Sequence, residues 1–490
     1  MLLGDALRLH GYTRHDLWLD EANSVAIARH AFTEIPAVLA RDSSPPIYYW
    51  LLHLWIRVMG ESEAAVRLPS VILGAVVIAA TAVLAFRLAG ERAAVASAWL
   101  VAVTPMAVQF SQQTRQYMLL PLCAVLATER LLVYLRGGRT GALAAHALAL
   151  VACFYTHNWG LLLFPGFVVA VALGPRDRWR PWGIAAALAL LSYLPWIPAL
   201  RQQMAGSSYR FIEVLGESQH VSLLPIQTLR LFASGVGNPG EQAMSLMPEF
   251  AGFLVAGLWV AVAATALVRQ PILKPAALQV LAIALAPLCA AAAWQAIGGR
   301  PIYFLGRYEI MVLPLVIAVV ASGAVLLFPW RWATALMAGW AVVLAVLSWD
   351  YTSAVRRTYP EPTMARALAP ALHPGDRVVF TGLFRATTEY YLRRSGATHY
   401  DAASFPPDVA DHLGWHFDDL YDVEAPALAE AARRNCPAPG HRTWVVGSND
   451  PTTFLLLRIL GTCSSMSKPF AARGRPASSL FLAEPLPGSS

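Results

Sequence analysis

The sequence predicts a mainly α-helical fold, in which a polytopic bundle of transmembrane helices is followed by a small soluble α/β domain. Of the 490 residues, 57% are hydrophobic and 14% are charged, whereas about 25% of the residues in soluble domains are charged. The net charge of +7 lies entirely in residues 1–349, because residues 350–490 hold 14 basic and 14 acidic side chains. These observations exclude a soluble enzyme and indicate a membrane protein with a polar tail.

The chain divides into three expected regions. Residues 1–63 form a first loop in which residues 21–31 have a helical composition, and Ile47–Met59 is an aromatic, amphipathic segment that is too short and too charged to span a membrane. Residues 64–349 form the transmembrane domain, and residues 350–490 form the soluble domain.

Ten segments of the middle region are apolar enough to be candidate spans. They are residues 64–86, 93–110, 117–135, 141–156, 158–174, 182–199, 249–268, 276–297, 308–328 and 332–349.

Basic side chains alternate along the connections between these spans. Every second connection is basic, and this set holds Arg87, Arg92, Arg136, Arg139, Arg176, Arg178, Arg180, Arg269, Lys274 and Arg331. The positive-inside rule places these connections in the cytoplasm. The first loop, the other connections and the tail are then expected outside, in a multi-pass protein of the cytoplasmic (inner) membrane.

The connections expected outside hold polar residues that suit transfer chemistry. Asp20 and Glu21 are adjacent carboxylates in the first loop, and Arg115 and Arg307 lie in later connections. An arginine offers a planar fork that fits phosphate oxygens, and a carboxylate can take a proton from a hydroxyl. Taken alone, Asp20 also fits a helix N-cap, and each arginine also fits a boundary residue that reaches the membrane surface.

The tail alternates between strand and helix patterns. Residues Arg377–Thr381 and Thr443–Gly447 are strand-like, and residues Thr387–Arg394 are helical and end before Gly396. Cys436 and Cys463 could pair if the tail faces an oxidising compartment. The tail contains no phosphate-binding loop motif, so we expect it to cap the site or to engage the acceptor.

Several motifs together resemble a known family. The runs LWLDEANSVAIAR and SPPIYYWLLHLWIRVMG, followed by FSQQTRQYMLL, YTHNWGLLL and GRYEIMVLPLV, resemble polyprenyl-phosphate-sugar-dependent GT-C glycosyltransferases. The nearest group is the bacterial one that is similar to protein O-mannosyltransferases and lipopolysaccharide-core glycosyltransferases. The resemblance covers residues 17–330, and the tail resembles the variable outer domain of the family.

This resemblance implies a role for each candidate residue. Asp20 would be the catalytic base that takes the acceptor proton, and Glu21 would orient it. The donor phosphate would be held by Arg115 and Arg307, with Tyr117 and Tyr308 beside them. Further substrate contacts would come from Pro46, Tyr48 and His157. The donor would be a polyprenyl-phosphate sugar, the acceptor a glycan, lipid or protein hydroxyl, and the outcome inversion at the anomeric carbon.

The chain departs from the family pattern in two places. Ser44 stands where family members have a histidine before the Pro-Pro pair, and only Met1–Leu9 remains of the span that precedes the Asp-Glu motif. No cofactor is expected; a divalent metal is compatible with Asp20 and Glu21 but is not indicated, and no nucleic acid is expected as a partner. The alternatives are a lipid-linked-sugar transporter or flippase without transferase activity, and a receptor or scaffold.

Overall fold

The computed structural model describes residues 2–205, 223–237, 244–299, 301–354, 359–408, 422–472 and 478–486. The chain forms two compact units. Unit 1 contains Met1–Tyr12, Ser43–Met204 and Tyr209–Val355, and unit 2 contains Thr13–Asp42, Ala205–Ser208 and Arg356–Ser490. The predicted regions divide differently, since residues 13–42, which carry Asp20, group with the C-terminal residues rather than with Ile47–Met59.

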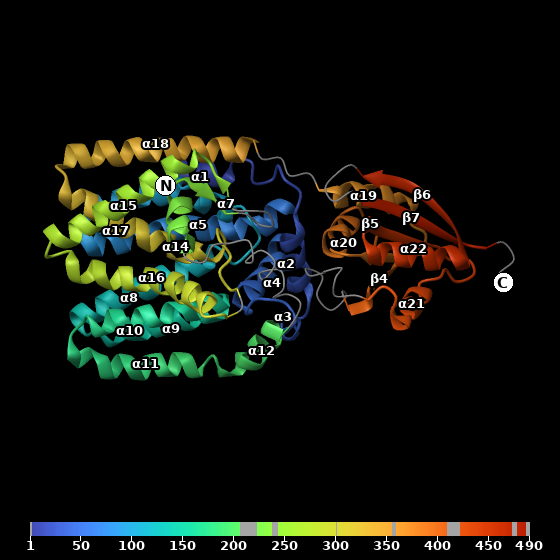
Figure 1. Cartoon of the computed structure of the whole chain (residues 1–490), viewed down its shortest axis with the longest axis horizontal. Coiled ribbons are helices and arrows are strands. Elements are labelled where there is room, and N and C mark those ends of the chain that lie inside the picture. Colours follow the sequence, from blue (N-terminus) through green and yellow to red (C-terminus); the bar gives the residue numbers. More distant parts are fainter. Residues whose placement is uncertain are drawn as a thin grey trace. The chain divides into compact units, whose positions relative to one another are not determined.

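Unit 1 is built from helices, and its long helices lie roughly parallel to one another (Figure 1). Its elements are α1 (Leu2–Leu9), α4 (Ile47–Met59), α5 (Glu63–Ala89), α6 (Glu91–Val103), α7 (Pro105–Ser111), α8 (Leu119–Gly137), α9 (Thr140–Thr156), η1 (Asn158–Leu163), α10 (Phe164–Ala172), α11 (Trp179–Leu191), α12 (Ile197–Ala205), α14 (Leu224–Ser234), α15 (Glu249–Arg269), α16 (Lys274–Ala296), η6 (Tyr308–Val312), α17 (Leu313–Leu327) and α18 (Trp330–Ala354).

Each of the ten predicted spans falls on a helix or helix pair of this unit. In the described residues, six helices are long and apolar enough to cross a membrane, and the bent pair α6 and α7 would make a seventh. The segments Thr140–Thr156 and Asn158–Ala172 are apolar but shorter. The number of membrane crossings therefore stays a prediction, whereas the helical class and its apolar character are confirmed.

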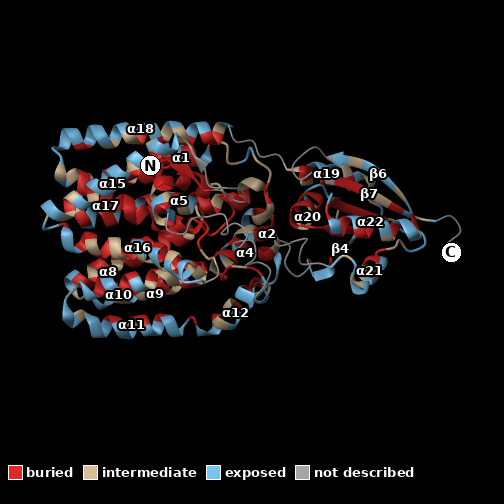
Figure 2. Cartoon of the chain, in the orientation of Figure 1, coloured by how far each residue is buried: buried red, intermediate tan, exposed pale blue. Residues whose placement is uncertain are grey.

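The helices of unit 1 differ in how much of their surface is buried, and a core helix can be told from peripheral ones (Figure 2). In the segment Tyr308–Leu327, 83% of the apolar window is buried, against 22% in Trp330–Ala354. On the peripheral helices, large apolar side chains such as Leu188 and Val342 are exposed. Exposed apolar side chains on long helices are expected where lipid, rather than water, surrounds the protein.

The predicted span 93–110 is not one straight helix, because α6 and α7 meet at an angle of 62°. Pro105 begins α7, and a proline has no N–H to bond to the carbonyl four residues earlier. That carbonyl belongs to Val101, and Arg8 of α1 donates to it at 3.3 Å and to the Ala102 carbonyl at 2.7 Å. The break is thus stabilised by a fully buried guanidinium.

The basic connections meet at one end of unit 1, which we call the basic end. Arg87 lies 3.1 Å from Glu129 and Arg130 2.5 Å from it, and Arg136 donates to the Arg87 carbonyl at 2.8 Å. Arg92 stacks on Trp330 with its guanidinium carbon 5.0 Å from the ring centroid. Arginines from alternate connections therefore lie at the same end of unit 1, as the sequence pattern predicts.

Unit 2 is an α/β domain that also carries the helices α2 (Leu19–Arg29) and α3 (Ile35–Ala40). Its sheet has the order β4-β3-β5-β7-β6, in which β3 pairs in parallel with β4 and β5, and β7 pairs antiparallel with β5 and β6. The strands are β3 (Arg377–Thr381), β4 (Asp401–Phe405), β5 (Thr443–Ser448), β6 (Ser464–Ala472) and β7 (Ser478–Pro485), and the helices are α19 (Pro360–Leu368), α20 (Arg385–Arg394), α21 (Pro426–Arg433) and α22 (Pro451–Cys463).

The sequence-based elements of the tail are confirmed by β3, α20 and β5. A buried core lies between the sheet and its helices and includes Val379, Val445 and Leu456. Cys436 and Cys463 form a disulfide, which links the end of α22 to the segment that follows α21. The pairing that the sequence left open is thus present.

Candidate functional site

Arg115 lies in the turn between α7 and α8, and α4 and α5 hold it in place. Its side chain is 5% exposed, and its Nη1 donates to the Tyr49 hydroxyl of α4 at 3.2 Å. The Ser70 hydroxyl of α5 donates to the Arg115 carbonyl at 3.4 Å, and the next residue, Gln116, donates to Ser44 Oγ at 2.9 Å. The turn therefore presents a buried guanidinium from a fixed backbone.

Arg307 lies directly before η6 and is also buried. Gly306 has a φ of +82°, a conformation that glycine adopts without steric cost. The Glu309 carboxylate accepts hydrogen bonds from the Gly306 N–H at 3.2 Å and from the Arg307 N–H at 2.8 Å. The Arg307 guanidinium carbon lies 4.5 Å from the Phe304 ring centroid. A buried carboxylate thus fixes the backbone that carries this arginine.

His157 shows that the two arginines approach the same place. It lies in the turn between α9 and η1, it is 4% exposed, and its Nδ1 accepts from the Trp159 N–H at 3.1 Å. Burial and the positive charges of Arg115 and Arg307 lower the pKa of His157 to about 3. The imidazole is therefore neutral at physiological pH. Both guanidinium groups, which come from different helix connections, lie near enough to act on it electrostatically.

Of the other two residues predicted for the phosphate site, Tyr308 packs on this histidine and Tyr117 packs on Phe110. The Tyr308 ring centroid is 4.3 Å from that of His157. The Tyr117 ring packs at 4.6 Å on Phe110, and its hydroxyl is buried without a hydrogen-bond partner among the residues that the structure describes. We call Arg115, His157, Arg307 and Tyr308 the arginine cluster.

Pro46 and Tyr48 belong to the same unit, at the start of α4. Pro46 is the buried residue before the helix, and the Tyr48 ring makes an edge contact of 5.7 Å with Tyr49. Tyr49 accepts the hydrogen bond from Arg115, so α4 supports the arginine cluster through the second tyrosine of the pair.

Asp20 and Glu21 lie in unit 2, in the first turn of α2. The N-cap of this helix is Trp18, so the interpretation of Asp20 as an N-cap is wrong; it is the second helical residue. Glu21 is 1% exposed, and its carboxylate accepts from the Trp18 N–H over a long 3.5 Å. Glu21 therefore caps the start of α2. The Asp20 side chain is half-buried.

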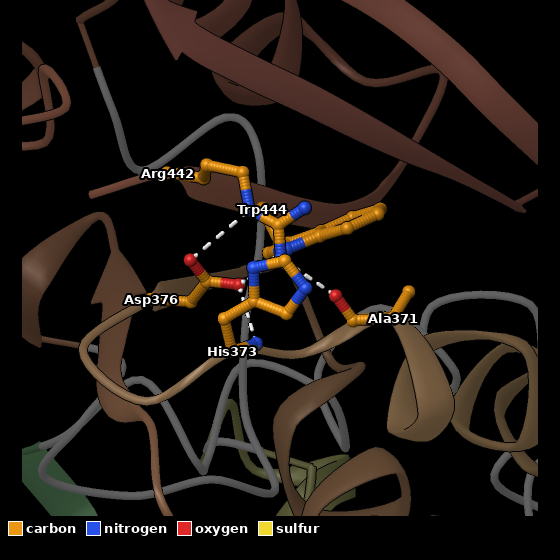
Figure 3. Close-up of polar contacts among 5 residues, drawn as sticks. All are labelled: Ala371, His373, Asp376, Arg442 and Trp444. Carbon is orange, nitrogen blue, oxygen red and sulfur yellow. Dashed lines mark hydrogen bonds and ion pairs between the residues drawn. The ribbon is translucent and has the colours of Figure 1, made fainter. Parts of the chain in front are cut away.

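A different carboxylate of unit 2, Asp376, illustrates a purely structural role (Figure 3). It accepts hydrogen bonds from Arg442 at 2.6 and 3.2 Å, from the His373 N–H at 2.9 Å and from the Trp444 indole at 3.2 Å. Burial alone would raise the pKa of Asp376, but these donors lower it. Asp376 directly precedes β3, and Arg442 and Trp444 lie at the start of β5, so these hydrogen bonds join the starts of the two strands.

Two residues that support the arginine cluster are not indicated by any sequence pattern. Tyr49 and Glu309 contact Arg115 and the Arg307 backbone, yet in the sequence each is one more residue of an aromatic or polar motif. Among the described residues, no group of three or more His, Cys, Asp and Glu side chains is arranged to hold a metal ion.

Comparison with known proteins agrees with this architecture. Residues 43–198 match the family model described as dolichyl-phosphate-mannose-protein mannosyltransferase. No curated protein matches the chain.

Among solved structures, the chain is similar to ArnT from Cupriavidus metallidurans bound to undecaprenyl phosphate, with 17% identity, a TM-score of 0.64, and 98% of this chain and 97% of that chain covered. The apo state of the same ArnT gives 16% identity and a TM-score of 0.63, with 98% and 97% covered. The family match over residues 43–198 therefore confirms the resemblance of that region to lipid-phosphate-sugar-dependent glycosyltransferases, and the chain shares the fold of ArnT over nearly its whole length.

Proposed function

We propose that this chain is a membrane glycosyltransferase that transfers a sugar from a polyprenyl-phosphate donor to an acceptor hydroxyl, with inversion at the anomeric carbon. The observation that carries the proposal is the arrangement of Arg115 and Arg307 around neutral His157. Two buried guanidinium groups that approach one place suit an anion with several oxygens, and the similar ArnT is bound to undecaprenyl phosphate.

In this proposal Arg115 and Arg307 bind the donor phosphate, and Tyr117 and Tyr308 donate further hydrogen bonds to it. The bond between the sugar C1 and the phosphate oxygen breaks, and the electron pair leaves with the phosphate. Because a phosphate monoester has a second pKa of about 6, it needs charge stabilisation rather than a general acid. Fixed arginines supply that stabilisation without reorganisation during the reaction.

Asp20 is the proposed base. The acceptor oxygen attacks C1 from the side opposite the phosphate, and its proton passes to the Asp20 carboxylate. An alcohol is far less acidic than a carboxylic acid, so proton transfer accompanies attack rather than preceding it. Glu21 supports this role indirectly, since its carboxylate lies at the N-cap backbone of α2. Pro46, Tyr48 and neutral His157 are proposed substrate contacts.

We further propose that the arginine cluster and unit 2 face the outside of the cytoplasmic membrane. The gathering of Arg87, Arg92 and Arg136 at the basic end supports a cytoplasmic position for that end. The disulfide between Cys436 and Cys463 supports an oxidising compartment for unit 2.

The proposal is tested in two steps with the purified full-length protein. Binding of undecaprenyl phosphate is measured by native mass spectrometry for the wild type, for Arg115→Lys, and for Arg92→Lys as a control at the basic end. We expect the Arg115 variant alone to lose affinity. Mass spectrometry of glycolipids and glycoproteins from cells with and without the protein then identifies the sugar and the acceptor. An unchanged glycan profile together with lipid-phosphate transport would instead favour a flippase.

A further inference from the structure

The start of α2 is held by a contact between residues far apart in the sequence. The Leu17 N–H donates a 2.7 Å hydrogen bond to the Tyr391 hydroxyl of α20, and the two residues are 374 positions apart. Leu17 has an exposed fraction of 0%, and a buried backbone N–H needs an acceptor. The Tyr391 hydroxyl therefore fixes the backbone just before α2.

The residue before Leu17 contacts the neighbouring helix. The Asp16 carboxylate lies 4.0 Å from Arg366 of α19. Burial and the charge of Asp16 together raise the pKa of Glu361, also on α19, to about 7. Asp16 and Leu17 are thus placed against two adjacent helices of the α/β domain, since α19 and α20 pack on each other.

Helix α20 is itself fixed to the sheet. Tyr390 and Leu392 have no exposed surface, and Arg385 donates to Ser404 of β4 at 2.9 Å. Helix α2 also packs along α20. The hydroxyl that receives the Leu17 N–H is therefore carried by a rigid part of the domain, not by a loop.

Only two residues separate Leu17, which makes this contact, from Asp20. The helix begins at Leu19, and Asp20 is its second residue, so a shift of the Leu17 backbone moves the Asp20 carboxylate with it. We propose that Tyr391 is a positioning residue, which holds the start of α2 on the C-terminal domain and thereby sets the place of Asp20. This inference rests on the proposed function, in which Asp20 takes the acceptor proton, and it gives the C-terminal domain a part in the transfer step.

Tyr391→Phe is the test variant, because it removes the accepting hydroxyl and keeps the ring. Tyr400→Phe is the matched control: it removes a phenolic hydroxyl of the same unit whose charged neighbours, Glu389, Arg393 and Arg385, all belong to α20. Two quantities are measured on the full-length protein: the kinetics of sugar transfer, and hydrogen–deuterium exchange of residues 17–22.

We expect kcat to fall at least about tenfold in Tyr391→Phe, since a misplacement of about 1 Å costs up to ~100-fold. The donor KM should stay unchanged, because the arginine cluster is untouched, and exchange at residues 17–22 should rise. Tyr400→Phe should behave as the wild type in both measurements.

Wild-type exchange and kinetics in Tyr391→Phe would overturn the proposal, and so would faster exchange with an unchanged kcat. A loss of kcat in both variants would mean that the domain is destabilised in general, which also contradicts a specific role. If the wild type transfers no sugar, the proposed function fails, and the exchange of residues 17–22 still decides whether Tyr391 holds the start of α2.

Discussion

Unit 1 and unit 2 hold their candidate functional residues by different means. In unit 1, Arg115 and Arg307 lie in connections between helices. Arg115 is fixed by hydrogen bonds with α4 and α5, and Arg307 by the hydrogen bond that its N–H donates to Glu309. In unit 2, Asp20 lies on a short helix that is packed on a folded α/β domain. The fixed arginines of unit 1 can bind a charged group, whereas the carboxylate on α2 of unit 2 can accept a proton. Changes in the two units should therefore affect different kinetic quantities.

The strongest test of this difference is Asp20→Asn, which keeps the size of the side chain but cannot accept a proton at neutral pH. We expect transfer to fall by ~100- to 10,000-fold, the usual cost of losing a general base, with donor binding unchanged. Initial-rate kinetics at varied donor concentration measure both quantities. Glu21→Gln is the control, and we expect a much smaller loss, because Glu21 lies at the helix N-cap.

If Glu21→Gln is inactive and Asp20→Asn is active, Glu21 rather than Asp20 is the base. Full activity in both variants would place the base elsewhere in the chain.

The second prediction concerns unit 1. Arg115→Lys and Arg307→Lys replace a planar fork with a point charge, so we expect the donor KM to rise about tenfold in each. We expect kcat to fall as well, because the arginines also stabilise the leaving phosphate, while the acceptor KM changes little. Donor-dependence curves for both variants, with Arg92→Lys as the control, decide this. Unchanged donor KM values in both would reduce the two arginines to membrane-boundary residues.

The comparison also shows what the sequence could predict. The range of α4 and the strand Arg377–Thr381 follow from local composition, and the structure confirms both. The grouping of residues 13–42 with the C-terminal domain could not be predicted, because it depends on contacts such as that between Leu17 and Tyr391, and no periodicity records a partner 374 residues away.

The candidate site was predictable to a similar degree. Arg115 and Arg307 were selected by residue type and position, and the structure brings both to His157. The supporting residues Tyr49 and Glu309 were not selected, because their roles depend on the fold of the turns that they hold. The bend at Pro105 was missed because the apolar run continues through it, although proline there removes a helix hydrogen bond.

A smaller effect is expected from Glu309→Gln in unit 1. The two carboxyl oxygens of Glu309 each accept a backbone hydrogen bond, and these bonds fix Arg307. An amide keeps one of the acceptor oxygens and replaces the other with a donor. A loss on the order of 1 kcal/mol would raise the donor KM roughly fivefold. The same donor-dependence curves measure it, and an effect on acceptor dependence alone would contradict a role in placing Arg307.

The smallest expected effect concerns the stability of unit 2. Burial and Asp16 raise the pKa of Glu361 from 4.5 to about 7, so the folded state binds this proton more tightly than the unfolded state does. The contribution of Glu361 to stability is then fully present below pH 4.5 and is lost, by on the order of 1 kcal/mol, as the pH rises through about 7. Thermal unfolding of the wild type and of Glu361→Gln across this range measures the effect. A wild-type profile that matches that of the variant would contradict it.

The most direct test of the division between phosphate binding and proton transfer is the affinity of Asp20→Asn for undecaprenyl phosphate, measured beside its rate of sugar transfer. The account predicts wild-type affinity with transfer reduced at least about 100-fold, the reverse of the loss of affinity expected for Arg115→Lys. An Asp20→Asn protein that has lost its affinity for the lipid phosphate, or that still transfers sugar at the wild-type rate, would contradict it.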